Sequence, residues 1–99
     1  YHGHNYDLTL KITGTPDPES GYVIDMKYLK DLIRQEVEDK YDHKNLNLDT
    51  EDFRELNPTA ENIAVVIYNN IKKQLPENLN LSVILHETER NFVEYSGNE

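Results

Sequence analysis

An apolar residue at every second position near the start of the chain is the pattern that most restricts its fold. Successive side chains of a strand point to opposite faces, so this period of two predicts a strand with one apolar face. We expect the strand to span about residues 5–13 and to end at Gly14. Other elements must cover its apolar face, which comprises Tyr6, Leu8, Leu10 and Ile12.

Two histidines precede this strand in phase with its apolar face. Residues i and i+2 of a strand lie about 6.5–7 Å apart and point the same way. The imidazoles of His2 and His4 can therefore bind one metal ion, and zinc is a common partner of imidazole. The alternative is that both are surface histidines at a chain end. We predict that His2 and His4 bind Zn²⁺.

The middle of the chain predicts two amphipathic helices. Asp25 is a suitable N-cap for the first, which has about four turns and a charged opposite side. Asn57 or Thr59 would cap the second, Pro58 is tolerated in its first turn, and Pro76 would end it. The first predicted buried stripe is Met26, Leu29, Ile33, Val37 and Tyr41, and the second is Ile63, Ile67, Ile71 and Leu75.

A second alternation, from Leu79 to Leu85, predicts another strand, and a turn at 89–91 leads to a third over 92–95. The order strand, helix, helix, strand, strand predicts an α+β fold with an antiparallel sheet in one domain over residues 1–99. Glu87 continues the alternating row. It either pairs with a cation, awaits a ligand, or is an ordinary exposed strand-end glutamate.

Composition narrows the classes of partner. The formal net charge is −9 and the sequence has no basic stripe, which argues against nucleic acid and anionic membranes as partners. Hydrophobic residues make up 36% of the 99 residues. A short chain with so few of them forms only a modest core, which favours a homo-oligomer. The chain has no apolar membrane-spanning run and no cysteine, which suggests the cytoplasm. Because the chain starts at Tyr1 without Met, we expect further residues upstream.

Asp42 and His43 follow the first predicted helix directly. They can form a C-terminal cap, because a cationic imidazole suits that end of a helix. They can equally form a catalytic dyad in which the carboxylate orients the imidazole. The residues alone would also nominate His43 as a third zinc ligand, since two protein ligands are too few for a stable catalytic site.

Taken in order, five motifs resemble the 6-pyruvoyl-tetrahydropterin synthase and 6-carboxytetrahydropterin synthase family. The resemblance implies a tunnelling fold, with a four-stranded antiparallel sheet and two helices on one face. Its first strand would lie upstream of Tyr1. It also implies edge-to-edge assembly of subunits into a barrel, usually as a hexamer. The motifs are His2-Gly3-His4-Asn5-Tyr6, Gly21-Tyr22-Val23-Ile24-Asp25, Asp42-His43-Lys44-Asn45-Leu46-Asn47, Asn57-Pro58-Thr59-Ala60-Glu61-Asn62 and Glu87-Thr88.

The same resemblance implies roles for individual residues. Zinc would be held by three histidines, two of which match His2 and His4, while the third lies upstream with a cysteine base. The residues matching Asp42 and His43 would transfer protons together with that cysteine. The glutamate matching Glu87 would bind the pterin substrate. The position of Thr59 would lie near the pterin of a neighbouring subunit.

The function implied is that of a zinc-dependent 6-carboxy-5,6,7,8-tetrahydropterin synthase in the queuosine route. The enzyme would act on 7,8-dihydroneopterin triphosphate by proton relay, with loss of triphosphate and acetaldehyde. One alternative is a 6-pyruvoyl-tetrahydropterin synthase of the tetrahydrobiopterin route. A second alternative is a non-catalytic, zinc-stabilised oligomer that binds pterin.

Overall fold

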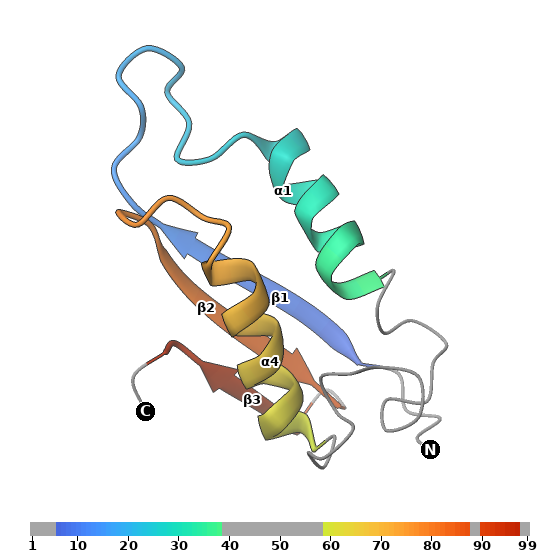
Figure 1. Ribbon diagram of the computed structural model, residues 1–99. Helices are drawn as coiled ribbons and strands as arrows, with labels where there is room; N and C mark the ends of the chain where they lie inside the picture. Colours follow the sequence, from blue (N-terminus) through green and yellow to red (C-terminus); the bar gives the residue numbers. More distant parts are fainter. Residues whose placement is uncertain (1–5, 39–58, 88–89, 98–99) are drawn as a thin grey trace.

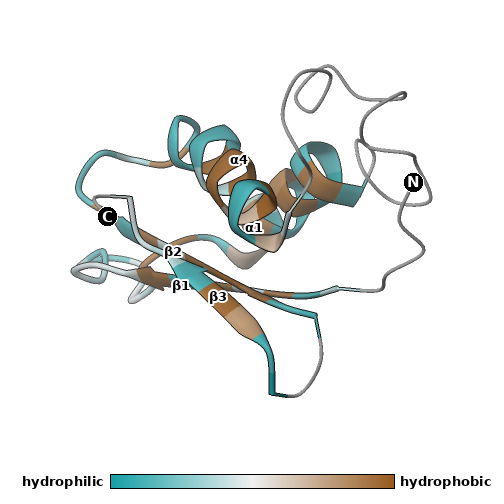
Figure 2. Ribbon diagram, turned by 90° about the horizontal axis from the view of Figure 1, so that it is seen from below, coloured by the Kyte–Doolittle hydropathy of each residue, from teal (hydrophilic) through white to brown (hydrophobic). Residues whose placement is uncertain are grey.

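The computed structural model describes residues 6–38, 59–87 and 90–97. They form a three-stranded antiparallel sheet in the order β1-β2-β3, with the helices on one face (Figures 1 and 2). The predicted α+β class and antiparallel sheet are confirmed. The fourth strand expected upstream of Tyr1 stays a prediction. Along the chain the elements are β1 (Asp7–Thr13), α1 (Met26–Ile33), η1 (Arg34–Glu38), α4 (Ala60–Lys72), β2 (Asn80–His86) and β3 (Phe92–Tyr95).

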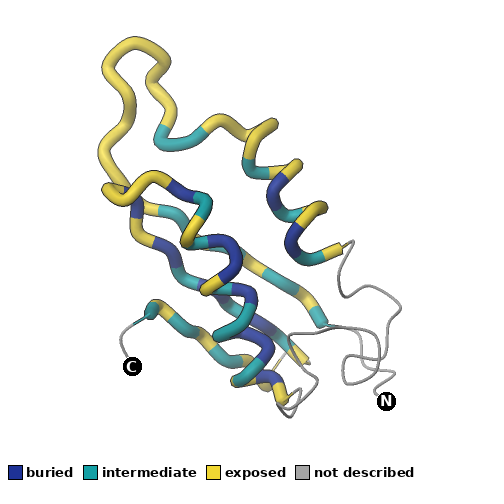
Figure 3. The backbone as a smooth tube through the Cα atoms, in the orientation of Figure 1, coloured by how far each residue is buried: buried dark blue, intermediate teal, exposed yellow. Residues whose placement is uncertain are grey.

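The strands form where apolar residues alternate, and their register aligns the apolar rows. Leu8 lies opposite Leu85 and Leu10 opposite Val83 across the β1–β2 pair. Buried residues of β2 and α4 face one another and make the core (Figure 3). The fully or nearly buried apolar side chains are Leu32, Ala60, Ile63, Ala64, Ile67, Ile71, Leu75, Leu79, Leu81, Val83 and Leu85.

The first helix begins as predicted, and its predicted buried stripe is confirmed in part, since Leu29, Ile33 and Val37 are half-buried. The Asp25 carboxylate accepts a hydrogen bond from the Lys27 backbone N at 3.2 Å, which caps α1. Met26, predicted to be buried, is 55% exposed, whereas Leu32 and Glu36 are buried. Hydrophobic spacing defines a stripe, but it does not define the rotation of the helix about its axis. Tyr41 lies outside the described residues.

A pair of hydrogen bonds fixes the first helical segment against the end of α4. The Gln74 amide donates to a carboxylate oxygen of Glu36 at 2.7 Å. The Tyr28 hydroxyl donates to the backbone oxygen of Gln74 at 2.6 Å. Glu36 lies in η1, where the helix widens to a π-helix. A buried carboxylate is tolerated when it is hydrogen-bonded, and this accounts for a charged residue in the interface.

The second helix ends earlier than predicted. α4 ends at Lys72 rather than continuing to Pro76. After Lys72 the backbone forms tighter turns, with hydrogen bonds between residues three apart. Gln74 N donates to the Ile71 oxygen at 3.0 Å, and Leu75 N donates to the Lys72 oxygen at 3.1 Å. Proline disfavours helical backbone in the residue before it, so its effect begins upstream of Pro76. Leu75 is nevertheless buried.

The end of β3 is held by two tyrosines and a glycine. The rings of Tyr68 and Tyr95 meet edge to face with centroids 5.0 Å apart. The Tyr95 hydroxyl donates to the Gly97 oxygen at 2.8 Å. Gly97 has a φ of +107°, and a Cβ there would lie 2.5 Å from the Tyr68 hydroxyl oxygen. This position therefore requires glycine on both conformational and steric grounds.

Gly97→Ala is expected to destabilise the protein by about 1–3 kcal/mol, because alanine would be strained at a positive φ and would displace Tyr68. Chemical denaturation of the complete protein measures this loss. Gly21→Ala is the matched control, since Gly21 also has a positive φ of 78° but has open space where a Cβ would stand. Equal losses in the two variants would show that the Tyr68 contact contributes nothing.

No helix in the described part of the chain is long and apolar enough to cross a membrane.

Candidate functional site

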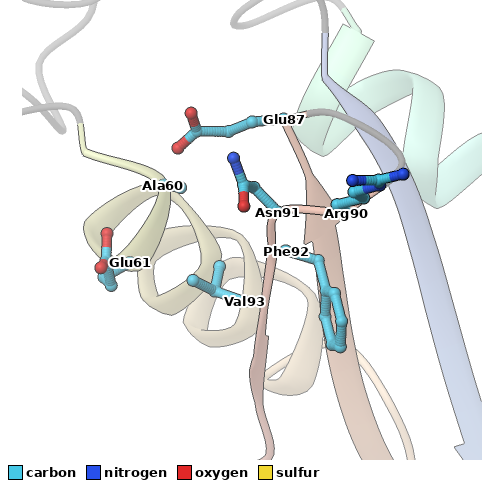
Figure 4. Close-up of a pocket in the computed structure, with 7 residues that line it drawn as sticks. All are labelled: Ala60, Glu61, Glu87, Arg90, Asn91, Phe92 and Val93. Carbon is cyan, nitrogen blue, oxygen red and sulfur yellow. The ribbon is translucent and has the colours of Figure 1, made fainter.

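A pocket of about 270 Å³ lies where the start of α4 meets the turn between β2 and β3 (Figure 4). Polar and apolar groups both line it, which suits a small ligand that has a flat apolar body and a polar edge. Figure 4 shows the side chains arriving from the helix, the turn and β3. The lining residues are Ala60, Glu61, Glu87, Arg90, Asn91, Phe92 and Val93.

Glu87 stands at the mouth of this pocket. The residue follows the last residue of β2, and its backbone N donates to the Asn91 oxygen at 2.9 Å. Its carboxylate extends toward Ala60 at the start of α4, and the Asn91 amide lies beside it (Figure 4). The side chain is exposed, unlike Leu85 two residues earlier. The structure thus offers an accessible carboxylate on the helix-covered side of the sheet.

Thr59 is the N-cap of α4, whose first residues line one side of the pocket. Its hydroxyl accepts a hydrogen bond from Asn62 N at 3.2 Å, and its backbone oxygen accepts from Ile63 N at 2.8 Å. This is standard N-cap geometry, so Thr59 has a structural role whatever else it binds. The partial positive charge of a helix N-terminus also favours nearby carboxylates such as Glu61 and Glu87. That Thr59 contacts a neighbouring subunit's pterin stays a prediction.

Tyr6, the residue before β1, lies within electrostatic range of two carboxylates of the pocket. Burial raises the pKa of its hydroxyl above the usual range, and the negative charges of Glu87 and Glu61 raise it further. The half-buried ring packs against the core. The hydroxyl therefore stays protonated near neutral pH. In the sequence pattern, Tyr6 is only an apolar residue of the first strand.

Of the seven lining residues, only Glu87 was predicted as a site residue. Two others appeared only inside a motif, and the turn and β3 residues appeared only as parts of the fold. The signal that could have found them is the pairing of β2 with β3, which brings the turn back over the start of α4. The six residues that were missed are Ala60, Glu61, Arg90, Asn91, Phe92 and Val93.

The predicted zinc ligands His2 and His4 and the predicted dyad Asp42 and His43 lie outside the described residues. Within the described ranges, no group of three or more His, Cys, Asp or Glu side chains could hold a metal ion. The donors of the pocket are carboxylates, an amide and a guanidinium, which do not make the nitrogen or sulfur ligand set that zinc prefers. Zinc binding at His2 and His4 stays a prediction.

The pocket between the N-terminus of α4 and the β2–β3 turn is the kind of concave, partly polar site at which small molecules bind. The family model described as "6-pyruvoyl tetrahydropterin synthase" matches residues 1–98. The chain belongs to this family, which confirms the resemblance found in the sequence.

Several known proteins are similar to the chain. It is 40% identical to 6-pyruvoyl tetrahydrobiopterin synthase of Poecilia reticulata, covering 97% of this chain and 65% of that protein. It is 33% identical to 6-carboxy-5,6,7,8-tetrahydropterin synthase of Rickettsia typhi, and this match covers 94% of this chain and 80% of that protein. The solved structure of Caenorhabditis elegans 6-pyruvoyl tetrahydropterin synthase matches with a TM-score of 0.88 and 36% identity. This match covers 98% of this chain and 69% of that one.

The chain thus spans slightly less than two thirds of the length of the Poecilia relative. It spans 58% of 6-pyruvoyl tetrahydrobiopterin synthase of Drosophila melanogaster, to which it is 41% identical.

Proposed function

We propose that the protein containing this chain is a synthase that acts on 7,8-dihydroneopterin triphosphate. The observation that carries the proposal is the accessible Glu87 carboxylate at the mouth of the pocket. A carboxylate can accept two parallel hydrogen bonds from the amino-pyrimidinone edge of a pterin, as it does from a guanidinium. Ala60 and Val93 line the pocket with apolar surface, against which the flat pterin ring can pack.

The chemistry proposed is a proton relay through His43 and Asp42, helped by a cysteine upstream. An imidazole oriented by a carboxylate can accept and return a proton near neutral pH. The pterin ring would be reduced at the expense of its own side chain, and triphosphate would leave. Zinc held by His2, His4 and a third histidine would supply Lewis-acid polarisation of the side-chain hydroxyls.

The product distinguishes two candidate enzymes. The motifs of the sequence favour the 6-carboxy product of the queuosine route, formed with acetaldehyde. The greater identity to relatives named 6-pyruvoyl tetrahydrobiopterin synthase, 40% against 33%, supports the 6-pyruvoyl product as a second candidate. Mass spectrometry of the products from 7,8-dihydroneopterin triphosphate separates them. No release of triphosphate by the complete protein would overturn both and leave a pterin-binding oligomer.

About one zinc ion per subunit is expected, with an open coordination position. His2→Ala should remove the metal and the activity, because the remaining ligands would be too few. Elemental analysis of dialysed complete protein measures the metal, and His86→Ala is a control because His86 packs on Phe92 at 5.1 Å between ring centroids. Protein without stoichiometric transition metal would contradict this prediction.

We propose that the protein is located in the cytoplasm and that it assembles as a closed homo-oligomer, most simply a hexamer. Within the described residues, β1 and β3 are the outer strands of the sheet, so each presents backbone groups that another strand can pair. Closed symmetric assembly would remove such edges. Light scattering of the complete protein should give about six times the subunit mass, and a stable monomer at micromolar concentration would exclude it.

A further inference from the structure

The candidate pocket combines two acidic residues with one basic residue. Glu61 and Glu87 line it in a chain whose formal net charge is −9, and Arg90 is the basic residue among those that line it. The proposed substrate carries a triphosphate, which acidic surroundings repel. A cationic side chain that meets the phosphate groups directly offsets this repulsion. The position of Arg90 therefore decides whether the pocket can hold such a ligand.

Arg90 stands on the turn between β2 and β3, and its side chain is exposed. The turn is closed next to it, because Glu87 N donates to the Asn91 oxygen at 2.9 Å. The chain then enters β3 at once, where Phe92 pairs with His86. Strand pairing thus holds the backbone on the C-terminal side of Arg90, so the guanidinium extends from a fixed point of the pocket.

The charged groups of Glu87 and Arg90 extend in different directions from the turn (Figure 4). The Glu87 carboxylate extends toward Ala60 at the start of α4, whereas the Arg90 guanidinium lies on the other side of β3 in this view. The pocket therefore has a hydrogen-bond acceptor toward one end and a cationic donor toward the other. The proposed substrate has the matching polarity, because its pterin edge donates hydrogen bonds and its triphosphate, at the opposite end, accepts them.

A guanidinium is well suited to a phosphate group. Its five N–H donors lie in a planar fork that can bind two phosphate oxygens at once, and it stays charged at neutral pH. Arg90 also has an interaction within the chain. Five donors are more than one such interaction uses, so the side chain can bind a phosphate as well.

We propose that Arg90 binds the triphosphate of the substrate and makes the pocket selective for the phosphorylated pterin over the free one. Glu87 holds the pterin edge, and Arg90 holds the opposite end of the same ligand. The inference rests on the proposed function for the identity of that ligand. Polyphosphate binding at Arg90 can nevertheless be measured without any pterin.

The test compares two arginine variants of the complete protein, Arg90→Gln and Arg34→Gln. Arg34 is a matched control, because it is an exposed arginine of η1, pairs with Asp31 at 3.7 Å and is not among the residues that line the pocket. Inorganic triphosphate is the first probe, and calorimetric titration gives its Kd. Arg90→Gln should raise this Kd about tenfold or more, because a charged hydrogen-bonding partner is lost.

Arg34→Gln should leave the Kd for triphosphate within about twofold of the parent value. Both variants make the same change in charge, and triphosphate bound elsewhere, including at zinc, contributes equally to both. Equal Kd values for the two variants would therefore overturn the proposal.

Neopterin, which has no phosphate, is the second probe. Arg90→Gln should leave the neopterin Kd within about twofold of the parent value, whereas Glu87→Ala should weaken neopterin binding and leave the Kd for triphosphate within about twofold. This opposite response would show that the two side chains bind different ends of the ligand. Equal losses for both probes in Arg90→Gln would indicate general damage to the pocket and would overturn the phosphate role.

Turnover of 7,8-dihydroneopterin triphosphate separates this inference from the proposed function. Arg90→Gln should raise the KM about tenfold, because the ground-state contact with the phosphate is lost. A parent protein that converts this substrate, with the same KM in Arg90→Gln, would overturn the inference and leave the proposed function standing. A parent protein that binds triphosphate through Arg90 but neither binds neopterin nor converts the substrate would overturn the proposed function and leave the phosphate site standing.

Discussion

Replacing Glu87 by alanine is expected to weaken pterin binding by about 2–4 kcal/mol, roughly a thirty- to thousandfold rise in Kd. The pterin would lose the acceptor for two parallel hydrogen bonds, and its buried donors would be left unpaired. The carboxylate is accessible at the pocket mouth, so its removal should cost binding rather than folding. Calorimetric titration of the complete protein with neopterin gives the affinity.

Glu94→Ala is the matched control for this experiment. Glu94 is an exposed glutamate of β3, and it alternates with Val93, which lines the pocket, so it lies on the opposite face of the sheet. The two variants make the same change in charge and in side-chain size. If both bound neopterin with the same affinity, Glu87 would be an ordinary solvated strand end.

His43→Ala is expected to lower turnover by roughly a hundredfold or more, with a smaller change in pterin affinity. The reason is that proton transfer by an imidazole acts in the transition state, whereas ground-state binding depends on other groups. Release of triphosphate from 7,8-dihydroneopterin triphosphate gives the turnover, and elemental analysis gives the zinc content. His86→Ala serves as the control for the zinc content.

The zinc content decides between the two roles considered for His43. Retained zinc with low turnover supports a proton-transfer residue. Loss of zinc from His43→Ala would instead make His43 a metal ligand, the alternative that the residues alone suggested, and the proton relay would then need another base.

The sheet could be predicted closely because strand patterns depend on local alternation. The predicted strand over about 5–13 is observed as Asp7–Thr13, and the predicted third strand over 92–95 is observed as Phe92–Tyr95. A slip of one residue in register would bury polar side chains, so the apolar rows of β1 and β2 determine their pairing. The core positions Val83 and Leu85 followed from the same alternation.

The helices were predicted less completely, since their contacts depend on distant residues. Burial of Glu36 requires the amide of Gln74, which is 38 positions away along the chain. No hydrophobic pattern contains that information. The predicted stripe was therefore wrong at Met26, which is exposed, and correct at Ile33 and Val37, which are half-buried. α4 ends early because the backbone forms a tighter turn before Pro76. A periodic hydrophobic pattern does not detect such a local change in backbone geometry.

The candidate site was predicted in part, through motifs rather than geometry. Glu87 was identified from the alternation and from the family resemblance, and the structure adds its neighbours. The place of Asn91 in the pocket depends on the β2–β3 pairing, so it was not visible before the strands were paired. The assignments of His2, His4 and His43 rest on sequence alone.

A crystal structure of the complete protein with bound neopterin tests the proposed pterin site most directly. The amino-pyrimidinone edge is expected to lie against the Glu87 carboxylate, with the ring in the pocket beside Ala60 and Val93. A pterin bound elsewhere, with the Glu87 carboxylate in contact only with solvent, would contradict it.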